Sequence, residues 1–176
     1  MPNPHWIVDT GRLVLTPVQA ADLPELQAIK ADPRVFALMH GGVRSPVRTA
    51  QELADDIAAW AANGFGMWIV RTRISQEMRG LTGLMERPDG RGIALRFAFW
   101  PEAQRRGLAR EAAGAALRFG HERAQLYRIV AAARESNIAS RTVLGSIGMW
   151  PCSRFVQNGH EMLLYESTRE ANLTQR

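Results

Sequence analysis

The stretch WPEAQRRGLAREAAGAALRFG, residues 100–120, follows an apolar run and turns into an alanine-rich helical pattern. Gly107 stands where the helix is expected to begin, with Arg105, Arg106 and Arg110 around it. A helix start leaves backbone N–H groups unpaired and carries partial positive charge, so it favours anions. A glycine there lets a ligand approach the backbone closely. The stretch therefore predicts a phosphate or pyrophosphate site.

Two interpretations of this glycine turn stay open on these residues alone. The arginines can bind a phosphate through their planar donor groups, or they can form a solvated basic helix start. The turn lacks the GK[ST] ending of a P-loop and does not match the GxGxxG dinucleotide fingerprint. Those two types of nucleotide-binding loop are therefore excluded.

Hydrophobic periodicity around the turn predicts a mixed α/β (α+β) protein. The expected order is strand, two helices, three strands, helix, strand, helix and two strands, and tight turns at residues 88–90 and 158–159 form hairpins. We therefore expect a largely antiparallel sheet. The expected strands cover residues 12–18, 66–73, 80–87, 93–100, 128–133, 150–157 and 160–166, and the expected helices cover residues 20–32, 45–64, 108–120 and 137–148.

Length and composition indicate an ordinary globular protein with one domain, residues 1–176, whose core covers about 11–166. Apolar residues make up 46% of the chain, and no apolar run approaches the roughly 20 residues of a membrane span. The first residues show no basic segment before an apolar block, so we expect no secretory signal. Cys152 is the only cysteine, which excludes an internal disulfide and a thiolate zinc cluster and favours the reducing cytoplasm. We expect Cys152 to be buried and His121, on a helix, to lie at the surface.

The charge of the chain is strongly basic and comes almost entirely from arginine. The formal net charge is +5, and Lys30 is the only lysine. Arginine suits phosphate recognition, but a genome rich in G and C produces the same bias. The net charge alone does not separate nucleic acid from a small phosphorylated ligand.

The spacing of the turn is more specific than its charge. Pro101, Gln104, Gly107 and Ala109 spell P-x-x-Q-x-x-G-x-A, which resembles the acetyl-CoA-binding motif [RQ]-x-x-G-x-[GA] of the GNAT superfamily of N-acetyltransferases. TGRLVLTPVQAADLPEL, residues 10–26, resembles the opening strand and helix of the branch that acetylates ribosomal-protein N-termini. NIASRTVLGSIGM, residues 137–149, resembles that branch's N-x-x-S-x-x-(V/L)-L-x-x-(L/I)-G-(F/M) segment. The resemblance spans about residues 11–166.

This resemblance implies a GNAT-like fold with a six- to seven-stranded sheet, splayed fourth and fifth strands and about four flanking helices. It also implies acetyl-CoA as a co-substrate whose pantetheine lies between the splayed strands. The residues implied to bind acetyl-CoA are Phe97, Ala98 and Phe99 through their backbones, the turn residues Gln104, Arg105, Arg106, Gly107, Leu108 and Ala109 at the pyrophosphate, and Asn137 near the pantetheine or thiol end.

The implied reaction is direct acetyl transfer to an amine, without a metal. The amine must lose a proton before it attacks, and the leaving thiolate must be stabilised or protonated. The resemblance places Ser140 near the thiol, where its hydroxyl can act. Many relatives carry a glutamate at the start of the fourth strand, but this chain has Ala94. Glu86 across the hairpin and Glu161 on the last hairpin are candidate replacements, and binding of the neutral fraction of the acceptor is the alternative to any base.

Several functions remain open. The expected acceptor is a protein N-terminal amine or a small-molecule amine, and the basic loops over residues 34–49 argue against polyamines and strongly cationic peptides. The alternative is a catalytically inactive module that binds acyl-CoA, which the loss of the glutamate supports, or a basic RNA-associated protein. GSIG, residues 145–148, formally fits a GxxG loop, but it ends a helix, and aromatic residues interleaved with arginines are sparse. Nucleic acid is therefore not favoured, nor is a membrane, and we expect a monomer or homodimer.

Overall fold

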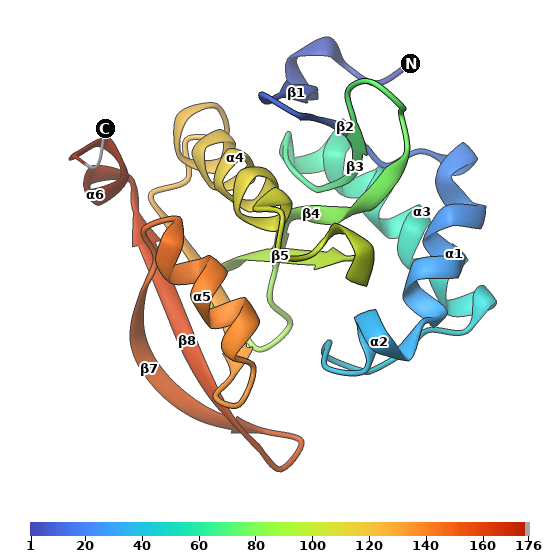
Figure 1. Cartoon of the computed structure of the whole chain (residues 1–176). Coiled ribbons are helices and arrows are strands. Elements are labelled where there is room, and N and C mark those ends of the chain that lie inside the picture. Colours follow the sequence, from blue (N-terminus) through green and yellow to red (C-terminus); the bar gives the residue numbers. More distant parts are fainter. Residues whose placement is uncertain (175–176) are drawn as a thin grey trace.

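The computed structural model describes residues 1–174 of the chain. Within them, eight strands form one sheet with helices on both faces (Figure 1). The strands are β1 (Val8–Asp9), β2 (Leu13–Pro17), β3 (Met67–Thr72), β4 (Met78–Glu86), β5 (Ile93–Phe99), β6 (Arg128–Arg134), β7 (Trp150–Gln157) and β8 (His160–Thr168). The α-helices are α1 (Leu23–Ala31), α2 (Pro33–Phe36), α3 (Pro46–Asn63), α4 (Leu108–Glu122), α5 (Ile138–Ser146) and α6 (Arg169–Thr174), and short 3-10 helices span Pro4–Trp6, Ala20–Asp22 and Pro101–Ala103. The mixed α/β class is confirmed.

The strand order across the sheet is β1-β2-β3-β4-β5-β6-β8-β7. Neighbouring strands are antiparallel except for β5 and β6, which are parallel and share a single registered pair, Ala94 with Val130. Beyond that pair the two strands separate. Strands β5 and β6 are the fourth and fifth strands expected from sequence, because β1 was not among the expected strands. Their separation is the predicted splay.

The described chain has more elements than the six to seven strands and about four helices that we expected. The additional strand is β1, whose two residues pair with Val14 and Leu15 and are too few to show an alternating pattern. Helix α2 is a single turn beginning at Pro33, where the Asp32 carboxylate accepts a hydrogen bond from the Arg34 N–H (2.9 Å). Helix α6 is also short, with six residues, and follows β8 directly.

The helices form two layers around the sheet (Figure 1). Helices α1 to α3 pack on one face, and α4 and α5 pack on the other. The predicted limits of α3 are confirmed: the Ser45 hydroxyl accepts a hydrogen bond from the Arg48 N–H (3.2 Å), and Gly64 ends the helix with a φ of 72°.

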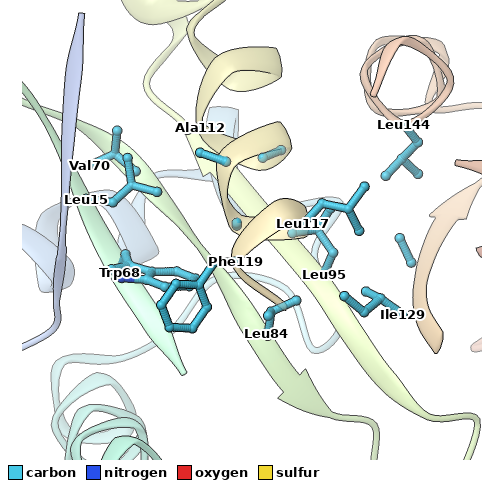
Figure 2. Packing of buried hydrophobic residues seen from close by; sticks show 14 of the residues in the cluster. Leu15, Trp68, Val70, Leu84, Leu95, Ala112, Leu117, Phe119, Ile129 and Leu144 are labelled. Atoms are coloured by element: carbon cyan, nitrogen blue, oxygen red, sulfur yellow. The ribbon is translucent and has the colours of Figure 1, made fainter. Parts of the chain in front are cut away.

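The larger part of the core lies between α4 and the sheet, as Figure 2 shows. Small residues of α4 such as Ala112 are fully buried and let the helix approach the strands closely. At Gly120 the approach is so close that a Cβ would lie 2.5 Å from Cδ1 of Ile129. Trp68 packs edge-to-face on Phe119, with ring centroids 4.9 Å apart. This packing fixes α4 and the turn that precedes it.

Two expectations about exposure are wrong. His121 is fully buried, with Nδ1 2.8 Å from the Leu126 carbonyl O and Nε2 3.0 Å from Ser167 Oγ. A carbonyl only accepts, so Nδ1 carries the proton and Nε2 accepts from the Ser167 hydroxyl. Burial lowers the pKa of His121, so the ring is neutral at pH 7. Cys152, in contrast, is exposed on β7.

Candidate active site

The predicted phosphate turn connects β5 to α4 and has a constrained backbone. Arg105 and Gly107 have φ values of 64° and 74°, in the left-handed region that glycine adopts freely and that strains other residues. Gly107 is the N-cap of α4, and no side chain caps this end of the helix. The first amides of α4 therefore receive no acceptor from a cap, and the turn can offer them to an anion.

Arg12, the residue before β2, holds this turn in place. Its guanidinium donates a hydrogen bond to the Arg106 carbonyl O (2.7 Å) and pairs with Glu111 in the first turn of α4 (2.7 Å). Acidic residues at this end stabilise a helix through its dipole. Arg12 was missed in the sequence, because no local pattern connects it with a turn so far along the chain.

The three arginines of the turn are available to a ligand. Arg105, Arg106 and Arg110 are exposed. None of their side chains forms a hydrogen bond or ion pair with another residue in the range 1–174. Charge-assisted contacts from such groups suit a phosphate.

The other predicted residues of the turn and of the end of β5 are fixed by the fold. The Gln104 side-chain amide donates to the Phe99 carbonyl O (3.4 Å). Ala98, Phe99 and Leu108 are buried, and Ala109 is half-buried. Side-chain packing therefore occupies these residues, and their backbone groups are what they can offer a ligand.

A cleft of about 80 Å³ lies where β5 and β6 separate. It brings together three predicted residues, Phe97 on β5 with Asn137 and Ser140 at the start of α5. Beyond the Ala94–Val130 pair, the facing strand edges are not in register with each other, so their backbone N–H and C=O groups need other partners. An extended chain that carries amides can satisfy them as an added strand would.

The start of α5 presents a hydroxyl to this cleft. Asn137 caps the helix, and its Oδ1 accepts a hydrogen bond from the Ser140 N–H (3.2 Å). Ser140 lines the cleft, and its hydroxyl has no hydrogen-bond partner in the described chain. Because a hydroxyl both donates and accepts, Ser140 can donate to an atom held in the cleft.

The cleft is cationic. Arg87, Arg96, Arg134 and His40 line it, and its described lining contains no aspartate or glutamate. Burial, followed by the charge of Arg96 and further arginines, lowers the pKa of His40, so this ring is neutral at pH 7. The Gln157 side-chain nitrogen forms a hydrogen bond with Nδ1 of His40.

Arg96 lines this cleft and also a second hollow of about 130 Å³ that lies toward α1 and α3. The guanidinium has no hydrogen bond and no ion pair with any residue that the structure describes. Burial, and then repulsion by Arg44 and Arg87, lowers the pKa of Arg96, while Glu52 and Asp56 attract its charge. An arginine remains protonated at pH 7, so Arg96 is a partly buried cation without a partner.

Acidic residues of α3 in the second hollow were missed in the sequence. Glu52 pairs with Lys30 (2.8 Å), Arg44 (3.1 Å) and Arg48 (3.2 Å). Asp56 lies one turn further along α3 and forms no hydrogen bond or ion pair with the described residues. Burial raises the pKa of Asp56 to about 6.

The helical pattern of α3 contained the signal that Asp56 is unusual. The buried side chains of this helix are Thr49, Leu53 and Trp60. Position 56 falls on the same stripe, because 49, 53, 56 and 60 follow the spacing of one helix face. A carboxylate on a core-facing stripe is either paired or functional more often than not.

The positions considered from sequence for a proton acceptor, 86, 94 and 161, do not lie together. Glu86 is exposed at the end of β4 and pairs with Ile93, which packs against the α4 side of the sheet. Successive residues of a strand point to opposite faces, so Ala94 faces the other side. Glu161 is exposed on β8 and lines a separate surface hollow. Neither glutamate lines the cleft that contains Ser140.

A larger hollow of about 780 Å³ follows α4 and the end of α5. Arg12, Arg110 and Arg118 line it, and it touches the predicted turn at Gly107. It contains neither the separated strand edges nor Ser140. The separated strand edges and Ser140 meet instead in the smaller cleft.

No helix in residues 1–174 is long and apolar enough to cross a membrane. The same residues contain no group of three or more His, Cys, Asp and Glu side chains that could hold a metal ion.

The chain resembles known proteins both in sequence and in structure. Residues 12–150 match the family model of the acetyltransferase (GNAT) domain. The structure resembles that of a Bordetella pertussis protein described as a GNAT-family acetyltransferase, with a TM-score of 0.81, 27% identity, and coverage of 92% of this chain and 99% of that one. No curated protein matches the sequence significantly.

Two more distant structures share the fold. A ribosomal L7/L12 alpha-N-protein acetyltransferase in complex with coenzyme A has a TM-score of 0.77 and 17% identity, over 94% of this chain and 99% of that one. A spermidine N-acetyltransferase variant from Vibrio cholerae has a TM-score of 0.75 and 14% identity, over 94% and 99%. At these identities the likeness concerns the fold, and it accommodates both protein and polyamine acceptors.

Proposed function

The chain belongs to the GNAT family of acetyltransferases, and from this premise we propose that it transfers the acetyl group of acetyl-CoA directly to an acceptor amine. The observation that carries the proposal is the separation of β5 and β6 beyond the Ala94–Val130 pair, beside the uncapped helix start at Gly107. Acetyl-CoA combines an extended chain that carries amides with a pyrophosphate. The separated strand edges fit the extended chain, and the uncapped helix start fits the pyrophosphate.

Different residues of the chain bind the two parts of acetyl-CoA in this proposal. The backbones of Phe97, Ala98 and Phe99 bind the pantetheine as a neighbouring strand would. The turn binds the pyrophosphate through the amides of Arg105, Arg106, Gly107, Leu108 and Ala109, and Gln104 and Arg12 stabilise its conformation. Asn137 fixes the first turn of α5 beside the thiol end.

Ser140 acts on the leaving group in this proposal. When the amine attacks the acetyl carbonyl carbon, the bond to sulfur breaks and negative charge develops on the thiolate. A hydrogen bond donated by the Ser140 hydroxyl stabilises that charge, and a preorganised donor is most effective where water is excluded.

The proton of the amine needs an acceptor, and we propose Asp56, acting directly or through a water. Asp56 and Arg96 line the second hollow, and Arg96 also lines the cleft, so the two spaces adjoin. A base works best with a pKa near the working pH, and burial raises the pKa of Asp56 to about 6. Glu86 has neither the position nor the enclosure of Asp56.

The acceptor is a protein N-terminal amine or a small-molecule amine. The cationic lining of the cleft disfavours polyamines, whose charges Arg87, Arg96 and Arg134 would repel. We propose a cytoplasmic setting, as the single exposed cysteine suits reducing conditions.

The decisive experiment measures acetyl-CoA binding by calorimetry and acetyl transfer to an amine panel by mass spectrometry. Gly107→Glu should abolish binding, because it adds bulk and negative charge where the pyrophosphate lies. Gly159→Glu is the matched control, since Gly159 has a similar φ of 75° and no atom near its Cβ position. Equal affinity in folded Gly107→Glu would remove the turn from the proposal.

A second candidate function is an acyl-CoA-binding module without turnover, which Ala94 favours because it replaces the carboxylate that many relatives carry. Tight acetyl-CoA binding by the wild-type protein, with no acetylated product from any amine in the panel, would support this candidate over the enzyme.

A further inference from the structure

Arg96 is a partly buried charge without a hydrogen bond or ion pair among the described residues. It lies on β5, directly before Phe97 and on the same strand face as Ala94, so its side chain points toward α3 and away from α4. There it borders both the cleft and the second hollow. A group that reaches the thioester from the α3 side must therefore pass Arg96.

Three of the neighbouring basic groups have partners, whereas Arg96 and Arg134 have none among the described residues. Lys30 and Arg44 pair with Glu52, and Arg87 pairs with Asp89 (2.6 Å). Asp56 attracts Arg96 but forms no ion pair with it. Because burying an unpaired cation destabilises a fold, a partner from outside the chain accounts for this arrangement.

We propose that the acceptor carries a carboxylate near its amine and that Arg96 binds this carboxylate. The inference rests on the proposed function, because it names the substrate class of the same site. The planar guanidinium presents paired donors that match a carboxylate. The cleft lining, with three arginines and no described acidic residue, favours the same charge. The phosphates of acetyl-CoA do not account for Arg96, because the proposed pyrophosphate site lies at the turn before α4.

The test compares acceptors that differ only in the carboxylate. The probes are free amino acids and their amides, and hexapeptides with aspartate or asparagine at the second position. For the wild type we expect kcat/KM for the carboxylate member of the preferred pair to exceed that of its amide by about tenfold or more. Arg96→Gln should reduce this preference to less than about threefold, mainly through KM.

Two further variants separate charge recognition from structure. Arg96→Lys should retain part of the preference, because it keeps the charge but loses the paired donors. Arg73→Gln is the control: Arg73 is exposed directly after β3, and its side chain donates to the Thr10 carbonyl O. Acetyl-CoA affinity should stay unchanged in all three variants.

A binding measurement keeps the test independent of turnover. N-acetylated amino acids, which would be products, should bind the protein–CoA complex more tightly than their amides do, and Arg96→Gln should remove the difference. Equal use of acids and amides by the wild type, or a preference that survives in Arg96→Gln, would overturn the inference while leaving the acetyltransferase proposal intact. Absence of acetyl-CoA binding would instead overturn the proposed function. If acetyl-CoA binds and neither member of any pair reacts or binds, the carboxylate site does not exist.

Discussion

Replacing Asp56 by asparagine should stabilise the protein at neutral pH, and the size of the effect follows from the burial of the carboxylate. Burial raises the pKa of Asp56 from its ordinary 3.8 to about 6. Each pKa unit corresponds to ~1.36 kcal/mol, so the folded protein at pH 7.5 carries an ionisation penalty of about 3 kcal/mol. Asparagine has no charge and removes this penalty.

The pH dependence gives the sign of the effect. Between pH 4 and 6 the folded protein holds the Asp56 proton more tightly than the unfolded chain, so the contribution of Asp56 to the free energy of unfolding falls as pH rises through this window. The advantage of Asp56→Asn should therefore be largest above pH 6 and should vanish near pH 4. At about 2–4 °C per kcal/mol, the melting temperature at pH 7.5 should rise by about 6–12 °C.

Denaturant unfolding followed by tryptophan fluorescence measures this difference, because Trp60 and Trp68 are buried reporters. The series should cover pH 4 to 8. Asp55→Asn is the matched control: Asp55 precedes Asp56 on α3 but is exposed, so its replacement should change stability by less than about 0.5 kcal/mol. A difference between wild type and Asp56→Asn that does not vary with pH, or a less stable variant at pH 7.5, would refute the reasoning.

Further predictions concern the ligand turn, the base and the buried histidine. Arg106→Ala should raise the calorimetric dissociation constant for acetyl-CoA about tenfold, or ~1.4 kcal/mol, at low salt and less at high salt; a loss independent of salt would indicate packing instead. Glu86→Gln should change kcat less than about threefold, whereas Asp56→Asn should lower it about a hundredfold; the opposite result would make Glu86 the base. His121→Gln should remove part of the acid sensitivity seen in unfolding curves. The contribution of His121 to stability falls below about pH 6.5, because the unfolded chain takes up a proton that the buried ring resists, and an unchanged pH slope in the variant would contradict this.

The elements that local signals define could be predicted from sequence. Ser45 and Gly64 mark the two ends of α3 because capping depends on neighbouring residues. The turn before β8 forms as expected, with Gln157 paired to His160. The turn at Gly107 is equally local, because its left-handed φ of 74° is a conformation that glycine adopts freely.

The features that escaped prediction depend on contacts between distant segments. His121 on α4 is buried with Leu126 and Ser167 as partners, and Ser167 lies far along the chain on β8. Periodicity shows that position 56 faces the core, yet it does not show that Arg96 is its neighbour across the layer. The spacing of a helix or strand shows which way a charged side chain faces. It does not show which side chain from a distant segment lies opposite.

The single registered pair between β5 and β6 divides the sheet into two ribbons, β1–β5 and β6–β8. In the free protein, amides on the two facing edges should exchange with deuterium more quickly than amides in the continuous ladders. A ligand lodged along the gap would connect both ribbons at once and slow exchange on each edge together. The sheet's cooperativity, and with it the resistance of the chain to proteolysis, would then depend on the supply of that ligand.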